Sequence, residues 1–205
     1  MIRLLTIALG LALAMPALTL AKGPPQPLSD WPCDTPLAGP LVVDALWPGA
    51  QATPDGAWHE DPAARELVEF LTAGENSPAM GEREIETFTE KHGPVTLETA
   101  LLVVSGMVER GNVLRRGLLK GIKDQIIRSH VLAETIAAAS TDIAAAAQQD
   151  TAAAKEQAAA LNEAQRQNTS GLDDADETAG RLCHRLVYDE TKLRRLAAAL
   201  KAHTQ

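Results

Sequence analysis

The sequence predicts an all-α protein: a long antiparallel helical hairpin with short N-terminal helices and an extended, proline-rich arm. Three observations favour this fold. Apolar residues recur every three or four positions over most of the second half, alanine is abundant there, and aromatic residues make up only 3% of the chain. A core that is poor in large rings must be built from Leu, Ile, Val and Ala, which suits closely packed helices. The 205 residues are enough for one domain with a modest core.

Residues 1–21 have the three parts of a cleaved secretory signal peptide. Arg3 supplies a positive charge, an apolar run extends from Leu4 to Leu20, and Thr19-Leu20-Ala21 places small residues before the cleavage point. An uncleaved anchor is the alternative, but a run of about 17 residues is marginal against the roughly 20 that span a bilayer. No cysteine follows the run, so a lipid anchor is not predicted. We therefore expect an exported, periplasmic protein with no membrane association after signal cleavage.

Residues 22–58 contain eight prolines, which exclude long helices and predict an extended arm. The arm also carries apolar side chains that are costly to leave in water, including Trp31, Trp47 and Trp58. We expect these side chains to insert where the arm lies across the helices. Two interpretations of the tryptophans stay open at this point: packing in the core, or a contact surface for another protein.

The two cysteines, Cys33 and Cys183, are separated by nearly the full length of the exported chain. In an oxidising compartment, an even pair without metal-type spacing most simply forms one disulfide. Closing so long a loop would remove roughly 5 kcal/mol of unfolded-chain entropy in the simple polymer description. A reactive or metal-binding pair is the alternative, but the sequence has neither a CxxC motif nor a second ligand cluster. We predict a structural disulfide that pins the arm to the helical domain.

The helical domain is expected to span residues 59–205 and to begin with two short helices. Asp61-Pro62 is a typical start, with an N-cap and a proline at the first helical position, and Gly74 marks the end of this helix. A second helix is expected from about residue 82 to 92. Gly93-Pro94 then ends it.

A long helix is expected over residues 96–167 and a return helix over residues 173–203. The apolar stripe of the first continues into an alanine-rich stretch, and a straight helix of this length would measure roughly 105 Å. Asn168-Thr169-Ser170-Gly171 predicts the turn between the two helices. Glycines between residues 106 and 121 either permit close helix approach or mark a bend. Heptad-like spacing also leaves a dimeric or trimeric coiled coil open.

No pattern in the sequence indicates a catalytic residue, a cofactor site or a metal site. His130 and Glu134 share a helix face without further ligands, and the acids from Asp173 to Glu177 lack the spacing of a calcium loop and suit a helix N-terminus. The net charge of −8 argues against nucleic-acid binding. A local basic cluster is therefore interpreted as a solvated helix face; it comprises Arg110, Arg115, Arg116, Lys120 and Lys123.

Several short motifs follow one another along the chain: Trp31-Pro32-Cys33, Trp47, Trp58-His59-Glu60-Asp61-Pro62, Gly121-Ile122-Lys123 and Arg181-Leu182-Cys183-His184-Arg185-Leu186. Their order resembles that in a group of exported, helical alphaproteobacterial proteins. The resemblance covers most of the chain after the signal peptide, and Trp31-Pro32-Cys33 is its most specific element. It implies a Gram-negative periplasmic setting and implies no activity. The alanine-rich stretch fits the pattern least well.

These observations favour a non-enzymatic periplasmic protein that acts through contact with another protein or with itself, as a scaffold, an adaptor or a chaperone-like accessory. The expected contact surfaces are the region 112–165 and the arm around the tryptophans. A protein that binds a small ligand or a metal between arm and helices is the alternative. An enzyme is the third hypothesis, because no residue pattern indicates a nucleophile or an acid–base pair.

Overall fold

The computed structural model describes residues 31–34 and 39–205 of the chain. The predicted signal peptide, residues 1–21, and the first part of the arm, residues 22–30, lie outside the described residues. The elements in chain order are α1 (Val43–Leu46), a 3-10 turn η1 (Ala57–His59), α2 (Pro62–Thr72), α3 (Pro78–His92), α4 (Leu97–Ala147) and α5 (Ala152–Ala202). These described residues form helices and no strand, which confirms the predicted all-α class.

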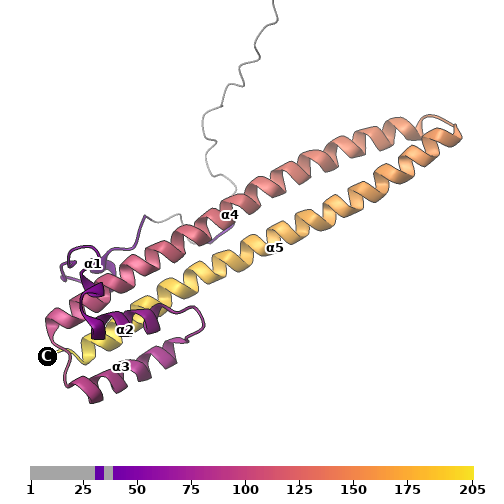
Figure 1. Ribbon diagram of the computed structural model, residues 1–205. Helices are drawn as coiled ribbons and strands as arrows, with labels where there is room; N and C mark the ends of the chain where they lie inside the picture. Colours follow the sequence, from indigo (N-terminus) through magenta and orange to yellow (C-terminus); the bar gives the residue numbers. More distant parts are fainter. Residues whose placement is uncertain (1–30, 35–38) are drawn as a thin grey trace, which may run out of the picture. The chain divides into compact units, whose positions relative to one another are not determined.

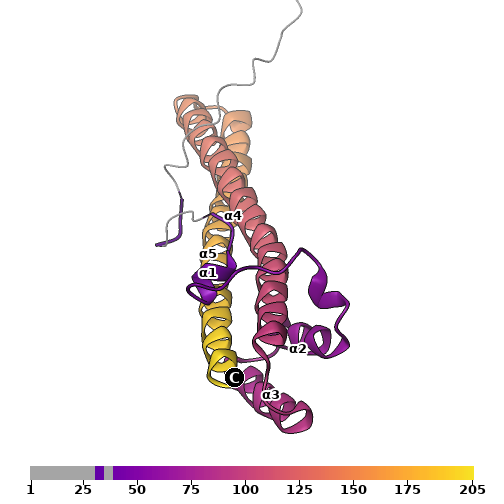
Figure 2. The same ribbon diagram turned by 90° about the vertical axis from the view of Figure 1, so that its left-hand side faces the viewer.

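Helices α4 and α5 form the antiparallel hairpin that the sequence predicts (Figure 1). Each has 51 residues, so each is about 76 Å long. Helices α1, α2 and α3 lie at the open end of the hairpin, where α4 begins and α5 ends (Figures 1 and 2). The rest of the hairpin continues as two helices.

The two helices pack along a continuous heptad seam. On both helices the inward residues alternate between steps of four and three, an average of 3.5 that is typical of a left-handed coiled coil. All of them are buried or half-buried. On α4 they are Val104, Val108, Gly111, Arg115, Leu118, Ile122, Gln125, Ser129, Leu132, Ile136, Ala139, Ile143 and Ala146. On α5 they are Ala154, Ala158, Leu161, Gln165, Asn168, Leu172, Ala175, Ala179, Leu182, Leu186, Asp189, Leu193, Leu196 and Leu200.

The predicted turn at residues 168–171 is wrong, and so are the helix bounds 96–167 and 173–203 derived from it. The turn lies at residues 148–151, where the Thr151 hydroxyl caps α5 by accepting a hydrogen bond from the Ala154 amide at 3.1 Å. The polar residues expected to turn are absorbed into α5. The Thr169 hydroxyl donates to the Gln165 carbonyl at 2.9 Å, as a mid-helix threonine does. Gly171 lies against the Leu132 side chain of α4.

The short helices largely match their predicted capping signals. Asp61 caps α2 by accepting hydrogen bonds from the Ala63 and Ala64 amides, both at 2.9 Å. Helix α3 begins at Pro78, earlier than expected, because Ser77 caps it and Gly81 lies within it. The predicted end at Gly93 is confirmed by its left-handed φ of 83°.

The main core lies at the open end of the hairpin, where all five helices meet. Gly106 is central to it, because a Cβ at this position would lie only 2.8 Å from the Trp58 ring. Helix α4 continues through its glycines without interruption. The glycines could either permit close packing or mark a bend, and Gly106 therefore permits close packing. The largest fully buried side chains of this core are Trp58, Leu67, Leu71, Ile85, Met107, Leu196 and Leu200.

The arm is fastened to the hairpin at several points. The predicted disulfide joins Cys33 to Cys183 of α5 with an S–S distance of 2.03 Å. Further along, the Leu41 amide donates to Asn112 Oδ1 at 2.8 Å, and Asn112 Nδ2 donates back to the Leu41 carbonyl at 3.0 Å. The described part of the arm is therefore extended and pinned, as expected, but it also forms α1 and η1.

Candidate functional site

The tryptophans predicted as a contact surface belong mainly to the core. Trp58 is 2% exposed, and its indole Nε1 donates to Glu109 Oε2 of α4 at 2.9 Å. Trp47 is 7% exposed, with the Lys201 ammonium 5.4 Å from its ring centroid. Both are too deeply buried to meet a partner, so the contact-surface interpretation is wrong for them. Trp31 is half-buried against Ile122 of the smaller core around the disulfide.

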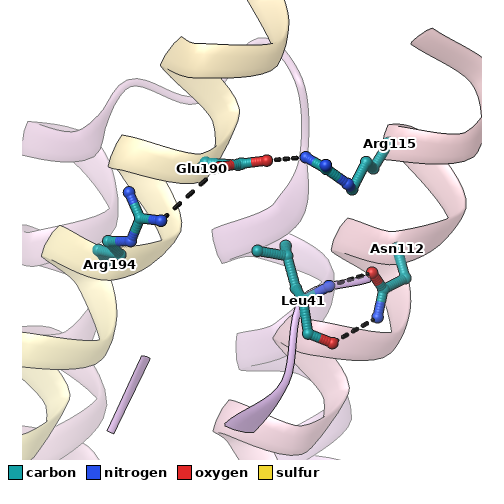
Figure 3. A network of polar contacts seen from close by, with 5 residues as sticks. All are labelled: Leu41, Asn112, Arg115, Glu190 and Arg194. Atoms are coloured by element: carbon teal, nitrogen blue, oxygen red, sulfur yellow. Dashed lines mark hydrogen bonds and ion pairs between the residues drawn. The ribbon is translucent and has the colours of Figure 1, made fainter. Parts of the chain in front are cut away.

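A partly buried network of charged and amide groups lies where the arm crosses the hairpin (Figure 3). Arg115 of α4 is 5% exposed and pairs with the Glu190 carboxylate of α5. Glu190 also lies 3.7 Å from Arg194 on its own helix, and one turn away Asn112 holds the arm at Leu41. Burial lowers the pKa of the Arg115 guanidinium, which still titrates far above neutral pH. This network fixes the arm and sets the register of the hairpin.

A second buried cation holds the end of α2 against α5. Lys192 Nζ donates to the Ala73 carbonyl at 2.7 Å, and burial lowers the pKa of this ammonium. Arg110 of α4 donates to the Thr72 hydroxyl at 2.9 Å on the same side. A cavity of about 20 Å³ next to Thr72, Arg115 and Lys192 accommodates a water molecule but no larger ligand. These cations therefore have a structural role.

A larger hollow of about 670 Å³ lies beside the disulfide and is open to solvent. Its ionisable side chains include Asp34 and His184, which are both exposed. Catalytic acids and bases are typically desolvated in a cleft. The hollow therefore has the shape of a surface groove.

The structure brings no metal-binding group together in the residues that it describes. No three His, Cys, Asp or Glu side chains there are placed to hold an ion. His130 and Glu134, which share a face of α4, are both exposed. Within the same residues, no helix is long and apolar enough to cross a bilayer.

The distal hairpin, defined as residues 132–172, differs from the open end in what supports it. Its seam has five large apolar residues, Leu132, Ile136, Ile143, Leu161 and Leu172, and each is only half-buried. The other seam positions are alanines or the amides Gln165 and Asn168, and Gln165 Nε2 donates to the Ser140 hydroxyl at 2.7 Å. Fifteen of the 41 residues are alanine, most of them exposed. The surface of the distal hairpin is consequently rich in small, exposed side chains.

The outward side of α4 carries isolated apolar residues, although the sequence predicted a single apolar stripe along this helix. Val113, Ile127 and Val131 are each more than half exposed, and Leu114 is 44% exposed. The signal was present in the sequence: these positions fall outside the steps of four and three that Val104, Val108 and Ile122 follow. Together with the distal hairpin, this side of α4 is the candidate contact surface, and all of it except residues 166–172 lies within the predicted region 112–165.

No protein-family model matches this chain, and comparisons with curated proteins and with solved structures find no match either.

Proposed function

We propose that this chain is an exported periplasmic scaffold or adaptor that acts by protein–protein contact, with the distal hairpin as its docking element. The observation that carries the proposal is the distal hairpin itself. It prolongs the two helices well past the point where α1, α2 and α3 pack (Figure 1). The part of the fold outside the distal hairpin already has two cores, its own helix caps and the disulfide, so it does not need this extension.

The surface of the distal hairpin favours another helical protein as the partner. Alanine has no side-chain rotamers to lose when it is covered, and its small size lets helices approach closely. The exposed alanines lie on both helices, for example Ala138 and Ala145 on α4 and Ala153 and Ala160 on α5. The disulfide supports the export part of the proposal, because such bonds persist in oxidising compartments such as the periplasm.

A shortened hairpin tests the docking role. Deleting residues 133–146 and 153–166 removes two heptads from each helix, leaves the turn between Ala147 and Ala152 intact, and keeps Leu132 opposite Leu172. We expect this variant to fold, with the disulfide formed. A photo-crosslinking residue at Ala138 or Ala145 of the full-length chain should give a discrete adduct in intact cells.

The same photo-crosslinking residue at Glu86, an exposed position of α3, is the matched control and should give no such adduct. The proposal is contradicted if distal and control positions give the same products. It is also contradicted if the shortened protein, carrying the crosslinker at Ala147, an exposed residue that it retains, still captures the partner with full yield.

A further inference from the structure

A second stripe runs along α4 on the side that faces away from α5. It consists of Val113, Gly117, Lys120, Asp124, Ile127 and Val131, spaced by alternating steps of four and three. We call this set the outer stripe. Val113, Ile127 and Val131 are 59%, 62% and 56% exposed. The Lys120 and Asp124 side chains are also largely exposed, and a Cβ at Gly117 would meet nothing within 4 Å.

The positions of the outer stripe are distributed symmetrically about residue 122. Val113 and Val131 lie nine residues from it, Gly117 and Ile127 lie five, and Lys120 and Asp124 lie two. Two antiparallel copies of α4 related by a two-fold axis at this position would bring each residue opposite its counterpart. Val113 of one copy then lies opposite Val131 of the other, and Ile127 lies opposite the space above Gly117. Lys120 lies opposite Asp124, and the two-fold axis makes each of these contacts occur twice.

We propose that the outer stripe binds the outer stripe of a second copy of this chain, forming a two-fold symmetric, antiparallel dimer. Charge complementarity selects this arrangement over a parallel one. In a parallel pair, Lys120 would face Lys120 and Asp124 would face Asp124, and like charges in contact disfavour association. Within one chain, Lys120 Nζ and Asp124 Oδ2 form an exposed ion pair at 2.6 Å. Such a pair contributes little, so exchanging it for pairs between two copies costs little.

The size of the stripe determines how strong the dimer is. Its 19 positions cover about 27 Å of helix, so the contact is smaller than a standard protein–protein interface. We therefore expect a dimer that dissociates in the micromolar range. The inference goes beyond the proposed function, because the outer stripe lies outside the distal hairpin.

Two charge reversals test the pairing. K120E alone places two acids opposite each other, and D124K alone places two lysines opposite each other, so each variant should self-associate roughly tenfold more weakly than the wild type. An equimolar mixture should recover dimerisation, because both contacts then join a lysine to an acid. Sedimentation equilibrium of the oxidised, full exported chain measures this. The control is K91E, a charge reversal on the exposed end of α3, and it should leave dimerisation unchanged.

The inference is overturned if the wild type stays monomeric throughout the micromolar range. It is equally overturned if the single variants dimerise like the wild type, or if their mixture shows no recovery while circular dichroism shows that both are folded. The shortened hairpin separates this result from the proposed function. It keeps the whole outer stripe and should dimerise normally even when it has lost the partner of the distal hairpin.

Discussion

At Gly106, the absence of a side chain lets the Trp58 ring lie directly on the backbone of α4. The Val68 side chain of α2 reaches the same point, and both would lie 2.8 Å from a Cβ at this position. Close by, the Glu109 carboxylate accepts hydrogen bonds from the Trp58 indole and from the Gly56 amide. The Trp58 ring is therefore packed against the backbone, and its indole nitrogen has a hydrogen-bond acceptor. The sequence predicted that Trp58 must find cover, but only the structure distinguishes the core from a partner.

Replacing Gly106 with alanine should destabilise the protein. The new methyl group would overlap three atoms of Trp58 and Val68, and such overpacking costs about 3 kcal/mol. This exceeds the gain of about 1 kcal/mol that alanine brings to a helix. Urea denaturation with the disulfide intact measures the difference. Gly180→Ala is the matched control, because its methyl group meets nothing within 4 Å, and it should raise the free energy of unfolding. A neutral Gly106→Ala variant would contradict this account of the contact.

Among the elements, the sequence predicts caps and stripes better than it predicts the position of the turn. Asp61 and Gly93 act locally, so their signals fix one end each of α2 and α3. The turn at residues 148–151 is different, because alanine clusters on both sides have the same high helix propensity. Thr151 is then one of several polar residues that are able to cap a helix, and the packing of α5 against α4 decides among them. The seam register was predictable from its spacing, whereas the outer stripe only becomes distinct once the seam is known.

Thr151→Ala tests the position of the turn. It removes the hydroxyl that accepts the hydrogen bond from the Ala154 amide, so it should cost about 1 kcal/mol of local stability. Amide hydrogen exchange should accelerate in the first turn of α5. Thr169→Ala is the comparison, because Thr169 lies inside α5, where alanine is the better helix former. Faster exchange around residue 169 instead of residue 154 would favour the turn that the sequence predicted.

Helix α3 is joined to α5 by a pH-sensitive ion pair. Both guanidinium donors of Arg195 lie 2.6 Å from the Glu82 carboxylate, and this hydrogen bonding lowers the pKa of Glu82 in the folded protein. Because the folded pKa is the lower one, the stabilisation is complete above the unfolded value of about 4.3 and is lost as the pH falls through the folded pKa. Glu82→Gln should therefore be less stable than the wild type at pH 7 and should match it at strongly acidic pH.

Urea midpoints measured across this pH range give the comparison between Glu82→Gln and the wild type. Glu86→Gln, on an exposed position of the same helix, is the control and should stay close to the wild type throughout. A stability difference that persists unchanged to strongly acidic pH would show that Glu82 contributes through packing and not through its charge.

In the described part of the chain, two hydrophobic cores stabilise the fold. The larger one joins all five helices at the open end of the hairpin, and the smaller one surrounds the disulfide at Ile122. Cys33 and Cys183 are 150 residues apart, so the bond connects the arm directly to the middle of α5. The larger core contains neither cysteine, which suggests that the helices assemble without the disulfide.

Reduction of the disulfide should therefore lower stability without unfolding the protein. A bond that closes a loop of 150 residues restricts the unfolded chain strongly, so we expect the free energy of unfolding to fall by roughly 3–5 kcal/mol. Helicity at room temperature should stay constant, because the larger core remains. Urea denaturation and circular dichroism compare the stability and the helicity of the oxidised and reduced wild type, which share one sequence. The double variant Cys33→Ala, Cys183→Ala should behave like the reduced wild type. Loss of helicity on reduction would mean that the larger core cannot hold the hairpin alone, and unchanged stability would contradict the stabilisation expected from restricting the unfolded chain.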